Sequence, residues 1–220
     1  MPGLESQAHE EGWFFSPSRF IVNKGTIYKE ALVLIAETRT EKTTYTYSDY
    51  LSWDDEFCEL VDGMMVASPS PVTSHQRVCR NLFVRLDRFL EGKPGEVFFA
   101  PYSVRLDPRK DLSDRTVLVP DIIVVLDPEK IDERGCNGAP DFVAEVLSPS
   151  NINHDRVVKF DKYLRGGVRE YWIIDPSART VQACVLENDE YKITVYGESA
   201  SVPVKVLPGC VIPLAEIFAY

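Results

Sequence analysis

Two apolar runs that each contain one acidic residue constrain the fold of this chain more than any other feature. Residues 119–125 read Val-Pro-Asp-Ile-Ile-Val-Val, and residues 142–148 read Phe-Val-Ala-Glu-Val-Leu-Ser. Short runs rich in β-branched residues predict buried strands. An ionised carboxylate is unfavourable there unless it is paired, hydrogen-bonded or bound to a metal. Asp121 and Glu145 therefore predict either a metal site on neighbouring strands or two strand-end acids that bond to backbone.

The segment that follows the second run predicts an amphipathic helix over residues 153–164. Asp155, Lys159 and Tyr163 recur every four residues and so share one helix face. Carboxylates that hold a divalent cation such as Mg²⁺, with a lysine that orients the attacking water, are the groups that phosphodiester hydrolysis uses. A simpler interpretation stays open, in which Asp155 and Lys159 form an ordinary i, i+4 ion pair and Tyr163 packs with its hydroxyl at the rim.

The remaining patterns alternate between strand and helix. Residues 57–66 predict a hairpin that turns at Asp-Gly, and residues 180–196 predict a second hairpin around Asn188 and Asp189. Residues 73–90 carry an apolar stripe at helical spacing, with residues 73–76 as a capping box. The whole predicts an α/β domain with a mixed central β-sheet flanked by helices.

Several short motifs follow one another in a specific order from about residue 44 to the C-terminus. They occupy residues 47–50, 59–63, 68–71 with His75, 120–121, 145–150, Asp155 with Lys159 and Tyr163, and 167–176. No single motif is diagnostic, whereas their order is fairly specific. In this order they resemble the Uma-two family, a branch of the PD-(D/E)XK restriction-endonuclease-like superfamily.

The resemblance implies a restriction-endonuclease-like core and an endonuclease that cleaves nucleic acid, with DNA as the expected partner. It implies that Asp121 and Glu145 bind Mg²⁺ or Mn²⁺, and that Glu59 is the acid contributed by an earlier element. By analogy with nucleases of this fold we also expect a homodimer, for which the apolar segment 210–214 is a candidate interface.

One position departs from the superfamily pattern. The pattern places a lysine two residues after the second acid, and this chain has Leu147 there. If the site is active, the cation has to come from elsewhere, with Lys159 the first candidate and Lys162 the second. Two rival functions therefore stay open: a catalytically inactive binding or assembly module of the same fold, and a metal-dependent hydrolase of a smaller phosphoester.

Two further candidate site residues have alternative interpretations. His75 lies in the first turn of its predicted helix, where it either bonds to a carboxylate or carbonyl in the core or shares a metal-bound water beside Glu59. Glu59 lies just before the hairpin turn. It either pairs with a basic residue across the hairpin or reaches a cleft at the sheet edge.

Composition bounds the class of protein. A chain of 220 residues that is 45% hydrophobic can bury a core without disulfides, and we expect residues 44–220 to form one domain behind an extension of unassigned role at residues 1–43. Five widely spaced cysteines without a C-x-x-C pair predict reduced thiols. Apolar runs are too short for a membrane span, and the start lacks a secretory signal, so we expect a cytoplasmic protein.

The net charge of −10 at first argues against nucleic-acid binding. Residues 61–175, however, hold 18 acidic and 16 basic residues, so that the excess of acid lies mainly elsewhere. Basic residues gather on one predicted helix and after the candidate site: Arg77, Arg80, Arg85 and Arg88, then Arg156, Lys159, Lys162, Arg165 and Arg169. Such groups are more often a solvated helix surface than a nucleic-acid footprint. Charge alone therefore does not decide the function.

Overall fold

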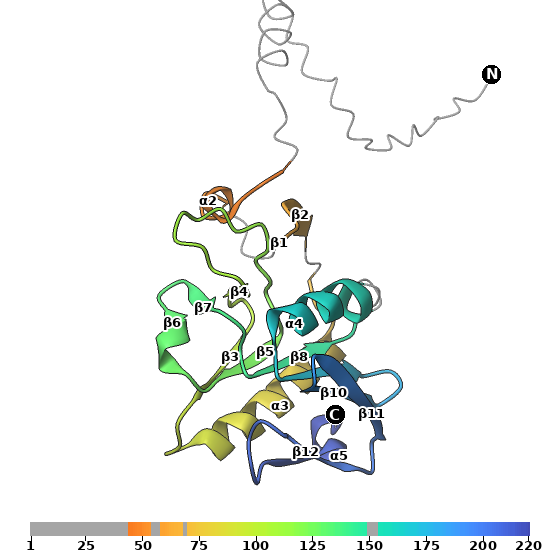
Figure 1. Cartoon of the computed structure of the whole chain (residues 1–220). Coiled ribbons are helices and arrows are strands. Elements are labelled where there is room, and N and C mark those ends of the chain that lie inside the picture. Colours follow the sequence, from red (N-terminus) through yellow and green to blue (C-terminus); the bar gives the residue numbers. More distant parts are fainter. Residues whose placement is uncertain (1–43, 54–57, 68–69, 149–153) are drawn as a thin grey trace, which may run out of the picture. The chain divides into compact units, whose positions relative to one another are not determined.

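The computed structural model describes residues 44–53, 58–67, 70–148 and 154–220 (Figure 1). They belong to the second of two units into which the chain divides, Thr43–Tyr220. The helical elements are α2 (Tyr47–Tyr50), α3 (Thr73–Leu90), the 3-10 turn η1 (Pro128–Lys130), the π-helical turn η2 (His154–Lys159), α4 (Phe160–Gly166) and α5 (Leu214–Ile217).

A six-stranded mixed sheet forms the centre of this unit. Its strands, in spatial order, are β11 (Glu190–Gly197), β10 (Thr180–Glu187), β9 (Glu170–Asp175), β8 (Phe142–Val146), β5 (Ile122–Val125) and β3 (Glu96–Phe99). Only the neighbours β8 and β9 run parallel, and the other neighbouring pairs are antiparallel. The predicted α/β class with a mixed central sheet is confirmed.

Smaller sheets surround the central one. They are β1 (Cys58–Val61) with β2 (Met64–Ala67), β12 (Ser201–Pro203) with β13 (Val211–Pro213), and β7 (Gly135–Asn137) between β4 (Val104–Arg105) and β6 (Ile131–Asp132). Two isolated bridges, Leu60 to Val117 and Val104 to Leu118, connect β1 and β4 to the segment that leads into β5. Glu59 is thereby held close to the start of β5.

Side-chain alternation along β8 separates two apolar cores. Phe142, Ala144 and Val146 pack into the cluster that contains the buried stripe of α3. Val143 and Leu147 pack into the second cluster, together with Tyr163 of α4. Because successive side chains of a strand point to opposite faces, Glu145 lies on the α4 face. In Figure 1 α3 and α4 lie on opposite sides of β8.

Both predicted hairpins are confirmed. The turn between β1 and β2 is Asp62-Gly63, with φ of 52° and 84°, and the turn between β10 and β11 is Asn188-Asp189, with φ of 52° and 64°. Left-handed backbone at both central positions is the geometry of a type I′ turn, which the short polar residues and glycine accept.

Two details of the predicted helices are wrong. Helix α3 has Val72 at its N-cap and no side-chain cap bond, so the expected capping box at residues 73–76 does not form. The helix predicted over residues 153–164 starts as the π-helical turn η2 and becomes α-helical only from Phe160. Lys159 is the last residue of the wider turn. π-helical turns recur at functional sites, where they redirect a side chain.

The segment 210–214 does not present its side chains as a dimer surface. Cys210, Ile212 and Leu214 are at most 2% exposed and pack in the core around α3, because β13 pairs with β12 and leads into α5. Among these five residues Val211 alone is strongly exposed. The proposed role of this segment in dimerisation is therefore wrong, since its apolar atoms are used within the chain.

Two other expectations concern cysteines and membranes. The five cysteines Cys58, Cys79, Cys136, Cys184 and Cys210 all lie within the described residues, and none of them forms a disulfide there. Across the part of the chain that the structure describes, no helix is both long enough and apolar enough to cross a bilayer.

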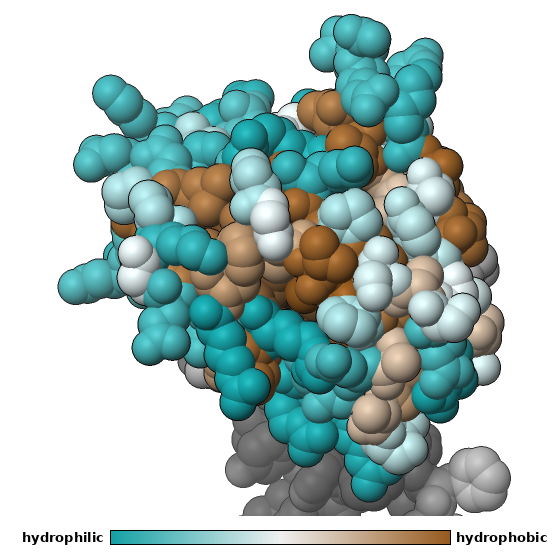
Figure 2. Space-filling view, turned by 90° about the horizontal axis from the view of Figure 1, so that it is seen from below, coloured by the Kyte–Doolittle hydropathy of each residue, from teal (hydrophilic) through white to brown (hydrophobic). Residues whose placement is uncertain are grey.

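Apolar side chains also reach the surface. The face seen from below in Figure 2 has brown, apolar residues at its centre with hydrophilic residues around them. A hollow of about 270 Å³ with an apolar lining lies between the end of α3 and the loop before β13, where Phe89, Leu126 and Val206 contribute.

Candidate metal-binding active site

Asp121 and Glu145 lie at the same end of two adjacent antiparallel strands. In the register of β5 and β8, Ile122 is opposite Ala144, so the next position outward brings Asp121 opposite Glu145. The backbone N–H of Val146, the residue after Glu145, donates to Oδ2 of Asp121 at 2.7 Å. Opposed residues of antiparallel strands have Cβ atoms about 5 Å apart. The sheet thus brings the two predicted ligands together.

Lys159 connects Glu145 to Glu59. Its Nζ lies 2.9 Å from Oε1 of Glu145 and 3.0 Å from Oε1 of Glu59. Glu59, Glu145 and Lys159 are at most 4% exposed. Oε1 of Glu59 also accepts the backbone N–H of Val119 at 2.7 Å. A lysine between two glutamates keeps these buried carboxylates paired, which a low-dielectric interior requires.

The second candidate lysine lies elsewhere. Lys162 Nζ is 2.6 Å from Oδ1 of Asp62 in the β1–β2 turn, at a partly exposed position. Its partner is thus the hairpin turn, whereas Nζ of Lys159 contacts Glu145 and Glu59. Lys159 is therefore the lysine that the structure brings to Glu145. The side chain of Asp155 lies outside the described residues.

Tyr163 belongs to the site although the sequence suggested only packing. Its side chain is fully buried, and its hydroxyl donates to Oε1 of Glu145 at 2.8 Å. The expected position of this hydroxyl at the rim is thus wrong. Burial, reinforced by the carboxylates of Glu145 and Glu59, raises the pKa of Tyr163 well above its ordinary value. The phenol therefore stays protonated as a donor. Its spacing of four residues from Lys159 was the sequence signal for this role.

Leu147 is part of the apolar core. It is 5% exposed and packs in the second cluster with Val143 and Tyr163. Its backbone N–H donates to the carbonyl of Ile174 at 2.8 Å, which continues the pairing of β8 with β9. Lys159 thus provides Glu145 with the cation that the strand itself lacks.

His75 and Cys79 adjoin Asp121 from the start of α3. His75 Nε2 lies 3.1 Å from Oδ2 of Asp121, and its Nδ1 lies 3.5 Å from Sγ of Cys79. The three residues could offer ligand atoms within 4.8 Å of one another. Burial, then the nearby carboxylates of Asp121 and Glu145, raise the pKa of the Cys79 thiol.

The donor set fits a hard divalent cation. Both donors to Asp121 reach Oδ2, and no described residue donates to its Oδ1, while the side chain is 16% exposed. With their carboxylates ionised, Asp121, Glu145 and Glu59 together with the ammonium of Lys159 carry a formal charge of −2. A divalent cation neutralises that charge, and carboxylate oxygens are the ligands that Mg²⁺ and Mn²⁺ prefer.

A solved structure shares this fold. The crystal structure of a protein from Anabaena variabilis ATCC 29413, described as "a putative nuclease belonging to DUF820", matches with a TM-score of 0.65 and 20% identity. The match covers 79% of this chain and 97% of that one. At this identity the likeness shows the fold, which is of the restriction-endonuclease-like class. No curated protein matches the chain.

The family follows from the sequence match. The model of the Uma2 family, described as "Putative restriction endonuclease", matches residues 47–215, and the chain belongs to this family. The expected family and fold are thereby confirmed. The matched span includes every candidate site residue: Glu59, His75, Asp121, Glu145 and Lys159.

Proposed function

We propose that this chain is a metal-dependent endonuclease that hydrolyses phosphodiester bonds of nucleic acid, with DNA as its substrate. One observation carries the proposal: Asp121 and Glu145 meet at the end of two antiparallel strands, with Lys159 bonded to Glu145. The family and the fold support the nuclease class. Metal-dependent phosphodiester hydrolysis is the chemistry that two carboxylates and a lysine support best.

Asp121 and Glu145 are the residues that would hold Mg²⁺ or Mn²⁺. A cation bound there polarises the scissile phosphate and lowers the pKa of the attacking water. The chain prepares both carboxylates for this. The N–H of Val146 holds Oδ2 of Asp121, and two donors, Lys159 and Tyr163, hold Oε1 of Glu145. Carboxylates fixed in advance need little reorganisation on binding.

Lys159 assists the attacking water and offsets the negative charge that develops on the phosphate. Glu59 acts through Lys159, since its bond to Nζ holds the ammonium in place beside Glu145. His75 supports Asp121 from the side of α3, where its Nε2 contacts Oδ2. Glu59 and His75 are thus positioning residues in this proposal. Removing either should weaken hydrolysis less than removing Asp121.

Calorimetry with Mg²⁺ and Mn²⁺, run beside a plasmid-nicking assay, tests the proposal. Wild type, Asp121→Asn and a matched control, Asp127→Asn, are compared. Asp127 is exposed and follows the opposite end of β5, so its replacement removes one carboxyl from the same strand region without touching the site. We expect wild type and the control to bind metal and nick plasmid, and Asp121→Asn to do neither.

Other outcomes would favour the rival functions. Wild type that binds no metal at millimolar concentrations and leaves nucleic acid intact would make Asp121 and Glu145 structural, and a binding or assembly module would replace the nuclease. Metal binding that depends on Asp121, with hydrolysis of a small phosphodiester but of no polynucleotide, would indicate a hydrolase of small phosphoesters.

The proposal includes two copies acting together in the cytoplasm. Cleaving both strands of a duplex at one place takes two hydrolytic events, and a symmetric homodimer supplies one site for each. Light scattering gives the mass in solution, and the ratio of linear to nicked plasmid reports whether two sites act on one molecule. A monomer that produces nicks alone would contradict the dimer and leave the hydrolytic site intact.

A further inference from the structure

A hollow of about 510 Å³ lies between the loop of residues 106–116 and helix α4. Four of its lining residues are cations, and two are acids: Arg109, Arg115, Lys162 and Arg165, with Asp107 and Asp114. We call it the basic hollow. In a chain with a net charge of −10, an excess of cations around one depression is unusual and points to an anionic ligand.

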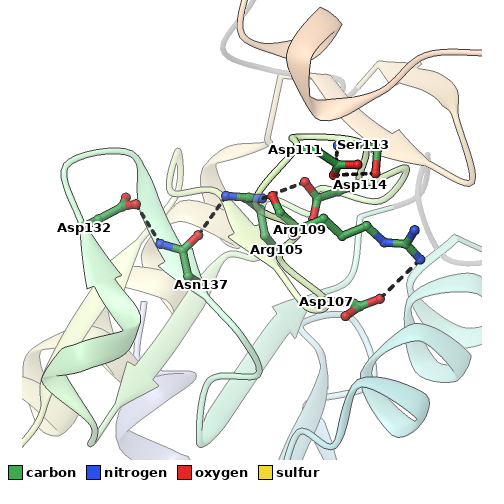
Figure 3. Close-up of polar contacts among 8 residues, drawn as sticks. All are labelled: Arg105, Asp107, Arg109, Asp111, Ser113, Asp114, Asp132 and Asn137. Carbon is green, nitrogen blue, oxygen red and sulfur yellow. Dashed lines mark hydrogen bonds and ion pairs between the residues drawn. The ribbon is translucent and has the colours of Figure 1, made fainter.

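One of the two acids is already neutralised. Asp114 is 4% exposed, and its Oδ2 accepts from Nη2 of Arg105 at 2.6 Å. Its Oδ1 accepts the backbone N–H of Arg109 at 2.6 Å. Figure 3 shows Arg105 and Asp114 bonded behind the loop, with the guanidinium of Arg109 directed away from them. Asp114 therefore shapes the loop, and its charge is compensated by an arginine outside the lining.

Each remaining ion pair of the lining has at least one exposed partner. Nζ of Lys162 lies 2.6 Å from Oδ1 of Asp62, at 20% and 67% exposure. Arg109 lies 3.7 Å from Asp107, and both side chains are mostly exposed, at 61% and 88%. Arg165 pairs with Asp161 on its own helix, at 78% and 47% exposure. Exposed pairs of this kind contribute little to stability. A phosphate group can replace the carboxylate in these pairs, because arginine binds phosphate more strongly through paired N–H donors.

The basic hollow and the candidate active site share two elements. Lys159 reaches Glu59 of β1, and Lys162 reaches Asp62 at the end of the same strand, in the turn. Lys159 and Lys162 are three residues apart along the helix, and their partners Glu59 and Asp62 are also three residues apart. The hollow and the site are thus connected by the same two segments, β1 with its turn and the helix formed by η2 and α4.

We propose that the basic hollow binds a backbone phosphate of the nucleic-acid substrate and thereby positions the strand for the site at Asp121 and Glu145. This inference rests on the proposed function for its choice of ligand. Arginine and lysine contacts to phosphate release counterions, so binding through the hollow is sensitive to salt.

Binding of a fluorescent DNA duplex in EDTA, followed by anisotropy across a salt series, tests the inference without cleavage. We compare wild type with the double variant Lys162→Gln/Arg165→Gln. The control is Arg88→Gln/Lys192→Gln, which also removes two charges from exposed positions, on α3 and β11. Each phosphate contact contributes about −0.9 to the slope of log K against log salt. The slope for the double variant should be less steep by up to about two such contributions. The variant should also bind duplex at least tenfold more weakly than wild type.

Three results would overturn the inference. They are a wild type that does not bind duplex at 50 mM salt, a double variant that binds like wild type, and a control that loses as much as the double variant. The charge-preserving variant Lys162→Arg/Arg165→Lys should retain the wild-type slope, which separates loss of charge from loss of fold. Pyrophosphate that binds wild type tightly, with duplex binding unaffected by the double variant, would make the hollow a small-anion site instead.

The two proposals can fail separately. Plasmid nicking by wild type reports hydrolysis, whereas the EDTA experiment reports binding alone. If wild type nicks plasmid and the double variant binds duplex as wild type does, the endonuclease proposal stands. The proposal that the basic hollow binds substrate phosphate is then wrong. Salt-dependent binding that falls in the double variant, without nicking under any metal, would keep the hollow and reject hydrolysis.

Discussion

Lys159 donates to Oε1 of Glu145 at 2.9 Å from a position fourteen residues further along the chain. The position just after β8 that could supply the same cation, two residues after Glu145, holds Leu147 in the core. A side chain at position 147 would approach the Glu145 carboxylate along the face of the strand. Lys159 approaches it from the helix that covers the strand. The buried carboxylate of Glu145 thus obtains its positive partner from the helix instead of the strand.

Replacing Lys159 with methionine should destabilise the fold strongly. The variant leaves Glu59 and Glu145 buried without their shared cation, and removal of one partner from a buried ion pair costs about 3–5 kcal/mol. Chemical denaturation at neutral pH measures the loss. Because the uncompensated carboxylates bind protons more readily in the folded state, the loss should shrink as the pH falls. Lys162→Met, at a partly exposed pair, should lose about 1 kcal/mol or less.

Replacing Tyr163 with phenylalanine should remove one donor to Glu145 and keep the ring. A hydrogen bond to a charged group contributes about 1.5–3 kcal/mol, whereas a bond between neutral groups contributes about 0.5–1.5 kcal/mol. Tyr191→Phe is the matched control, since its buried hydroxyl donates to the neutral carbonyl of Val168 at 2.9 Å. Denaturation curves should show the larger loss for Tyr163→Phe. Equal losses would contradict a charged acceptor at Glu145.

Adding Leu147→Lys to Lys159→Met should restore the cation from the strand. Residues two apart on a strand share a face, so a lysine at position 147 lies on the side of Glu145. Leu147→Lys alone should destabilise, because the position is buried and Lys159 already pairs with Glu145. The double-mutant cycle should give a favourable coupling of about 1–3 kcal/mol. Additive losses would mean that the strand position cannot serve Glu145.

The buried Glu170 should make stability depend on pH. Its side chain is fully buried, and burial raises its pKa despite bonds from Trp172 Nε1 at 2.8 Å and the Val206 N–H at 3.0 Å. A folded pKa above the unfolded value means that the folded state takes up the proton first. The contribution of Glu170 is therefore full below the unfolded pKa and declines as the pH rises through the folded one.

Denaturation of wild type and Glu170→Gln over a pH series measures this contribution. Wild type should gain stability relative to the variant as the pH is lowered. A difference that grows in the opposite direction would show that the bonds to Glu170 outweigh its burial. Glu187→Gln, at an exposed position, reports the effect of removing one carboxyl from the surface.

Elements whose geometry depends on residues close in the sequence could be predicted. The type I′ turns at residues 62–63 and 188–189 are specified by short polar residues and glycine that accept positive φ. The buried stripe of α3 follows from spacing alone. Acids inside apolar runs also indicated a site at Asp121 and Glu145, because burying them without partners is unfavourable.

What the sequence determined by itself is thus a set of local geometries and the types of residue that require partners. Tertiary structure decided the partners: Lys159 instead of Lys162 at Glu145, the Tyr163 hydroxyl inside the site, and His75 beside Asp121, forty-six residues away. It also assembled the basic hollow from a loop and a helix distant in sequence. The reason is physical. Local propensity acts over a few residues, whereas the choice of partner depends on how helices dock on the sheet and which charges that docking buries.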